Sequence, residues 1–182
     1  MKKKITITII CAVLSCVCLI GTTFAWLTAE TAPITNTFTY GDINITLEET
    51  TSTYKMVPGN TVAKDPVVTV LKESENCWVF VKIDKSTNFD TFMTYAVATG
   101  WTALDGETGV YYRTVDYNAT TNQEFHVLDG DVVSVKSAVT RDQLTSLTDA
   151  TLPTLTFTAY AVQRDNNFTT AAAAWAVVDP TP

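Results

Sequence analysis

The sequence has a single histidine, His126, and this scarcity excludes several classes of enzyme. A zinc protease of the HExxH type needs two histidines on one helix. A serine hydrolase triad would have to use His126, yet the chain has no GxSxG elbow to present a nucleophile. No phosphate-binding loop and no dinucleotide fingerprint occurs. The sequence therefore predicts a protein that is not an enzyme and needs no cofactor.

One weak metal candidate remains around the histidine. Asp129 and Asp131 follow His126 at the end of a strand pattern, where the three side chains could converge on a metal ion. The same residues are also consistent with an exposed strand residue followed by an Asp-Gly turn, and this is the interpretation we favour. The acidic pairs Glu48-Glu49 and Glu73-Glu75 lack the ordered spacing of a calcium loop, so we interpret them as solvated faces.

Basic residues are also few, and three of the 12 lie together at positions 2, 3 and 4. An apolar run, Ile5–Ile20, follows them, and Thr23-Phe24-Ala25 then places small side chains where a signal peptidase cuts. We predict a signal peptide over residues 1–25, cleaved between Ala25 and Trp26, and a secreted, extracellular or surface-associated product that keeps no stable membrane insertion. An uncleaved N-terminal anchor and a lipoprotein attached at Cys16 are the alternatives.

The predicted mature chain, residues 26–182, is strongly acidic and almost free of cysteine. Without the three N-terminal lysines, nine basic residues face 19 acidic ones, a net charge of about −10. This balance argues against binding to nucleic acid or to anionic lipid, both of which attract positive charge. Cys77 is the one cysteine left, so no internal disulfide can form, and its apolar surroundings predict a buried thiol.

The pattern of the mature chain is that of β-strands. Threonine and valine are abundant, and apolar residues alternate with polar ones through residues 34–40. The alternation changes parity after Gly41-Asp42, as at a bulge or bend, and continues through Ile43, Ile45 and Leu47. Further strands are expected at 67–71, at 77–83 as a central strand covered on both faces, in a 100–115 hairpin with Asp105-Gly106 near its tip, around Asp129-Gly130, and at 154–163.

Two segments depart from the strand pattern. Residues 140–147 begin with Thr140 and have Gln143 three positions later, which predicts a short capped helix. Residues 168–178 are rich in alanine, with Thr169 or Thr170 as the cap, and predict a second helix that packs Trp175 on the sheet. We therefore expect one all-β domain, a β-sandwich of the jelly-roll type with short helix insertions.

The aromatic residues allow two interpretations. Trp78, Trp101, Tyr111, Tyr112 and Trp175 could line a surface that binds sugars. They occur within strand patterns, however, so we expect that they pack in the core.

Three stretches together resemble the TasA/camelysin family of exported Gram-positive proteins, whose signal peptides are cut by the specialised signal peptidase SipW. They are GTTFAWLT at the predicted cleavage site, the strand NTFTYGDINITLEE, and the turn and strand YKMVPGNTVAKDPVVTV, which together cover residues 21–70. The resemblance implies a secreted jelly-roll subunit of an extracellular fibre or biofilm matrix. Camelysin is described as a metalloprotease, but this sequence has no recognisable zinc motif.

The resemblance also implies how such a subunit assembles. In TasA-like fibres the freed N-terminal segment pairs with the next subunit, which places the donor segment here at residues 26–40. The positions that match the family's first strand are Asn36, Thr37, Phe38, Thr39 and Tyr40. The implied partners are copies of the chain itself, joined head to tail, with or without an accessory matrix protein. A monomeric surface or secreted binding module and, less favoured, a camelysin-like metalloprotease are the alternatives.

Overall fold

A computed structural model describes residues 41–50, 54–165 and 167–178. Contacts within the chain separate residues 1–39 from residues 40–182, and every described residue lies in the second of these units. The predicted signal peptide, its cleavage site between Ala25 and Trp26, and the donor positions Asn36, Thr37, Phe38, Thr39 and Tyr40 all lie outside the described residues.

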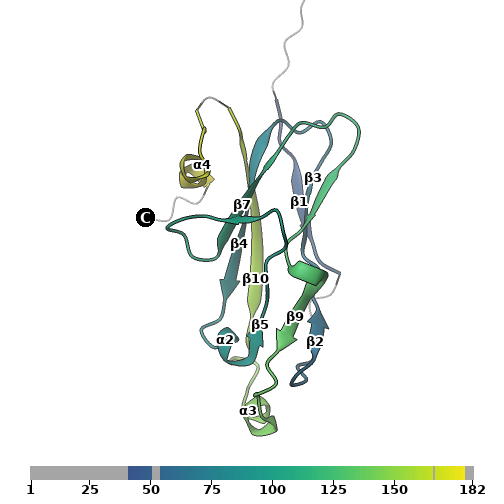
Figure 1. The fold of residues 1–182 in the computed structure, drawn as a ribbon, viewed down its shortest axis with the longest axis vertical. Helices are drawn as coiled ribbons and strands as arrows, with labels where there is room; N and C mark the ends of the chain where they lie inside the picture. Colours follow the sequence, from purple (N-terminus) through teal and green to yellow (C-terminus); the bar gives the residue numbers. More distant parts are fainter. Residues whose placement is uncertain (1–40, 51–53, 166, 179–182) are drawn as a thin grey trace, which may run out of the picture. The chain divides into compact units, whose positions relative to one another are not determined.

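The described part of the chain is built mainly from strands in antiparallel sheets, which confirms the all-β prediction; the jelly-roll type stays a prediction (Figure 1). The strands are β1 (Ile45–Glu48), β2 (Thr61–Ala63), β3 (Val67–Val70), β4 (Cys77–Lys85), β5 (Met93–Thr94), β6 (Thr102–Ala103), β7 (Val110–Val115), β8 (Gln123–His126), β9 (Val132–Val135) and β10 (Leu155–Gln163). The helical segments are α2 (Phe89–Phe92), the 3₁₀ turn η1 (Asp129–Asp131), α3 (Arg141–Thr145) and α4 (Ala171–Val178).

The strands that the structure describes form three sheets. One has four strands in the order β10-β4-β7-β6, and the other two have three strands each, β1-β3-β8 and β2-β9-β5. β8 and β9 are close in sequence but belong to different sheets, because η1 turns the chain between them with Gly130 and Asp131 at positive φ. The stretch around Asp129-Gly130 therefore holds two strands, and they do not form a hairpin.

The long strand β4 is the centre of the four-stranded sheet, and both of its faces are covered. Cys77, Val79, Val81 and Ile83 point into a core shared with β1, β3 and β8. Phe80 points to the opposite face, where it packs with Trp175 of α4. A strand buried on both faces has no polar alternation, which is why its sequence reads as a continuous apolar run.

Beside β4, the hairpin of β6 and β7 has the position that the sequence predicted. Thr102 pairs with Tyr112 and Ala103 with Tyr111, and Gly106 lies in the turn at positive φ. Gly109 also has a positive φ, and a Cβ at this position would lie 2.5 Å from the carbonyl oxygen of Ile83. Only glycine fits both the conformation and the space.

Both described helices that the sequence indicated are present with their caps. Thr140 accepts a hydrogen bond from the backbone N–H of Gln143, whose side chain accepts one from the Thr140 N–H, so α3 begins with a full capping box. The Thr170 hydroxyl accepts a hydrogen bond from the N–H of Ala173 at the start of α4. Trp175 is 4% exposed and meets Tyr160 of β10 edge to face, so α4 covers the outer face of the four-stranded sheet.

The aromatic residues lie mainly against the core rather than on a common surface. The indole of Trp78 donates to the Phe168 carbonyl, and its ring contacts Tyr112. The guanidinium of Arg113 lies over the rings of both Trp101 and Phe125. Burial lowers the pKa of Arg113, and the two ring faces stabilise the charge there.

No helix in the described ranges is long and apolar enough to cross a membrane.

The buried thiol of Cys77 gives a test of this core. Cys77 is fully buried, and burial raises its pKa to about 11 because the thiolate would lose its hydration. At pH 8 we expect the folded chain from Trp26 onward to react with a thiol reagent at least about 100-fold more slowly than the same chain in denaturant. Absorbance after addition of an aromatic disulfide measures both rates, and equal rates would show that β4 is not buried as described.

Candidate functional site

The seam between the edge strands β1 and β10 is the strongest candidate for a functional site. β1 ends the three-stranded sheet on one side, and β10 ends the four-stranded sheet. The two strands lie against each other, and apolar side chains of both, including Leu47, Leu155 and Phe157, pack on the same core. Among the described residues, no strand pairs with the outer edge of β10.

The hydrogen bonds identify the backbone groups that face outward along β10. Ser86 N–H donates to the Thr154 carbonyl, and Arg164 N–H donates to the Asn76 carbonyl, so the even-numbered residues of β10 exchange bonds with β4. In an antiparallel pair the alternate residues direct their N–H and C=O groups to the other side. These are Leu155, Phe157, Ala159, Ala161 and Gln163. The same reasoning, from the Leu71 N–H that donates to the Asn44 carbonyl, gives Ile45 and Leu47 on β1.

Two cavities line this seam and meet at the start of β10. One of about 300 Å³ lies between the end of β1 and Leu155, Thr156 and Phe157. The other, of about 430 Å³, lies between the first residues of β10 and β2, and it too includes Leu155 and Thr156. Its lining is mostly apolar and includes Tyr54, Met56, Val62, Phe89, Met93, Val133, Leu152 and Pro153, together with Lys64. Unpaired strand edges beside apolar cavities are suited to accept a further strand.

A basic residue lies within the seam. The Nζ atom of Lys64 is 2.6 Å from Oε1 of Glu49, and the Lys64 side chain is only 12% exposed. The same Glu49 oxygen accepts a hydrogen bond from the Tyr54 hydroxyl at 2.6 Å. Burial, with Glu49 adding to it, raises the pKa of Tyr54 far above its ordinary value, so the hydroxyl stays protonated and remains a donor.

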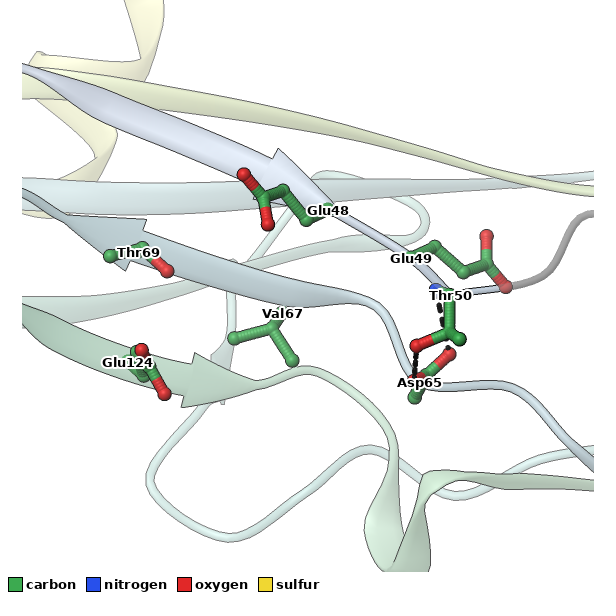
Figure 2. A pocket seen from close by; sticks show the side chains of 7 residues that line it. All are labelled: Glu48, Glu49, Thr50, Asp65, Val67, Thr69 and Glu124. Atoms are coloured by element: carbon green, nitrogen blue, oxygen red, sulfur yellow. Dashed lines mark hydrogen bonds between the residues drawn. The ribbon is translucent and has the colours of Figure 1, made fainter.

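Next to the seam, and sharing Glu48 and Glu49 with one of its cavities, a shallow acidic pocket lies on the exposed face of the sheet β1-β3-β8. Figure 2 shows Glu48, Thr69 and Glu124 on adjacent strands, and Thr50 joined to Asp65 by two hydrogen bonds. These bonds lower the pKa of the Asp65 carboxyl because they stabilise its charged form. The pocket has a volume of about 270 Å³ and contains the predicted acidic pair Glu48-Glu49.

The weak metal candidates come together only in part. His126 Nδ1 lies 2.8 Å from Oδ1 of Asp131, with both side chains open to solvent. Asp129 makes no hydrogen bond or ion pair with either of them; its backbone N–H donates to the Ala96 carbonyl. Within the described ranges, no group of three or more His, Cys, Asp or Glu side chains is placed to hold a metal ion.

Apart from the acidic pair Glu48-Glu49, the sequence suggested none of the seam residues as part of a functional site. Residues 154–163 were expected to form a strand, but the sequence pattern does not say whether that strand is central or at an edge. Glu49 and Lys64 are 15 positions apart and carry no recognisable motif. They come together only because β2, which ends just before Lys64, pairs in a different sheet from β1.

Comparison with known proteins gives one result. Residues 1–70 match the family model of the camelysin metallo-endopeptidases. No curated protein and no solved structure matches the chain. The described residues do not supply the donor set that a metallo-endopeptidase would need for zinc. The matched range includes the three stretches at residues 21–70, and it confirms for this N-terminal part that the chain is similar to the TasA/camelysin family.

Proposed function

We propose that this protein is a secreted structural subunit of an extracellular fibre, and that it assembles when the N-terminal segment of one copy enters the seam of the next. The observation that carries the proposal is the seam itself, in which β1 and β10, both edge strands among the described residues, lie together. An incoming strand would satisfy the outward N–H and C=O groups of β10 and cover the two cavities at the same time.

The length and composition of the N-terminal segment support this role. Residues 26–40 are 15 residues rich in Thr, Ala and apolar side chains. Fully extended, such a segment spans about 50 Å, whereas the nine residues of β10 span about 30 Å. One donor segment is therefore long enough to follow the whole free edge.

The geometry of the contact determines what forms. The donor segment and the seam are different surfaces of the chain, so the contact is head to tail and does not close on itself. Repetition of such a contact produces a filament. Cleavage before Trp26 would release the donor segment from the membrane and so start assembly outside the cell.

Electron microscopy of the processed chain tests the proposal. We expect the chain from Trp26 to Pro182 to form fibres as salt is raised, because salt screens its net charge of about −10. A chain without residues 26–40, and one with Gly and Ser in place of residues 36–40, should stay monomeric. The second variant keeps the chain length and serves as the matched control for the first.

The outcomes separate the alternatives. A processed chain that stays monomeric at every salt concentration would favour a binding module whose N-terminal segment occupies its own seam. Fibres that form equally well without residues 26–40 would exclude strand donation but not the fibre. Cleavage of casein that is lost on His126→Ala would support a protease instead.

A further inference from the structure

Lys64 is held in the seam next to the first residues of β10. Its Nζ lies 5.0 Å from the centre of the Tyr54 ring and 5.2 Å from that of Phe157 on β10. Glu49 provides one carboxylate oxygen. A lysine ammonium has three N–H donors, so a second carboxylate can bind without loss of the first.

Charge complementarity indicates what that second carboxylate is. Lys64 is the one basic residue among the described residues that line the two seam cavities, which also contain Glu48 and Glu49. The donor segment, residues 26–40, contains one charged side chain, Glu30. Binding of Glu30 adds a negative charge to an acidic domain, which is unfavourable unless that charge meets a cation. An ion pair that is shielded from water is stronger than one in solvent.

We propose that Glu30 of one copy pairs with Lys64 of the next, and that this ion pair sets the register of the donated segment and rejects strands of the wrong charge. The inference rests on the proposed function and adds the contact that makes the seam selective. A carboxylate in reach of Lys64 fixes one point of the donor segment beside Phe157. The Thr-rich remainder of the segment then follows the edge of β10 from that point.

Charge reversal in two separate chains tests this contact. The first chain carries Glu30→Lys. The second carries Lys64→Glu together with Glu49→Gln, so that two carboxylates are not placed side by side. Each chain alone would bring like charges together, and we expect its fibre growth, followed by light scattering and electron microscopy, to be at least about tenfold slower than that of the unaltered chain.

The mixture of the two chains is the decisive sample. The lysine introduced at position 30 of the first chain would then meet the glutamate introduced at position 64 of the second. The native Glu30 of the second chain would meet the native Lys64 of the first, so every contact in an alternating fibre is matched. Fibre growth should return to the unaltered rate. Glu49→Gln alone gives the reference rate for the second chain. Lys72→Glu makes the same charge reversal at an exposed lysine outside the seam and should assemble like the unaltered chain.

Each result has a defined meaning. Normal assembly by either reversed chain alone would overturn the proposed Glu30–Lys64 contact, but it would leave the proposed fibre function in place. Recovery only when all three substitutions are in one chain, and not in the mixture, would place the contact within a molecule and overturn the proposal. Failure of the unaltered chain to assemble would refute the proposed function instead. If circular dichroism shows that the second chain is unfolded, Lys64→Gln with Glu49→Gln replaces it, and its slower assembly should no longer respond to Glu30→Lys.

Discussion

Ala159→Pro is expected to stop fibre growth and to leave the domain folded. Ala159 directs its N–H away from β4, so a proline there removes no hydrogen bond of the existing sheet. The preceding residue already lies in an extended strand, which is the conformation that a following proline favours. An incoming strand, however, would lose a donor and meet the proline ring.

The magnitude follows from the lost bond. A strand carbonyl left without a partner costs about 1–3 kcal/mol, which lowers the affinity of the donor segment by about 5- to 150-fold before steric effects are counted. Fibre yield after sedimentation measures the effect. Circular dichroism and a urea titration should show a free energy of unfolding close to that of the unaltered chain.

The same sheet provides a matched control at its opposite edge. Leu104 N–H donates to the Val110 carbonyl, so Ala103 of β6 also directs its N–H outward. Ala103→Pro is thus the same substitution, and it removes an outward backbone N–H at the edge that lies away from the seam. We expect this variant to assemble normally. If it blocks growth as strongly as Ala159→Pro does, the site of strand addition is not the edge of β10.

Phe80→Ala is expected to destabilise the folded domain severely. Phe80 is fully buried between the four-stranded sheet and α4, with its ring 5.3 Å from that of Trp175. Truncation leaves a cavity that the surrounding rings cannot fill, and we expect a loss of about 3–5 kcal/mol in the free energy of unfolding. Urea denaturation followed by tryptophan fluorescence measures this loss.

An exposed position serves for comparison. Val57 is 49% exposed, and Val57→Ala should change the free energy of unfolding by less than about 0.5 kcal/mol. A loss for Phe80→Ala as small as about 1 kcal/mol would mean that α4 does not cover the sheet as described.

Much of the fold could be predicted from local sequence because its causes are local. The apolar run at 77–83 predicted a strand covered on both faces, and β4 is that strand. Thr140 and Gln143 predicted the capping box of α3, which needs only residues three positions apart. Asp105-Gly106 marked the hairpin of β6 and β7, since a short turn pairs neighbouring strands almost without choice.

The arrangement around the seam has no such local cause. The alternation in residues 155–163 is the same whether β10 has one neighbour or two, because side-chain period reports the faces of a strand and not its edges. Likewise, Glu124 and His126 lie in a strand pattern, but only the pairing of β1 and β8 with opposite edges of β3 brings Glu124 and Glu48 to the same pocket.

The sequence by itself determined that this is an acidic chain of strands with one buried cysteine, two capped helices and an N-terminal segment similar to that of the TasA/camelysin family. The tertiary structure decided which strands end their sheets, that β1 and β10 lie together, and that Lys64 is enclosed by Glu49, Tyr54 and Phe157. Conformational preference and hydrophobic period act over a few neighbouring residues, whereas these contacts join residues far apart in the chain and depend on the packing of the whole domain.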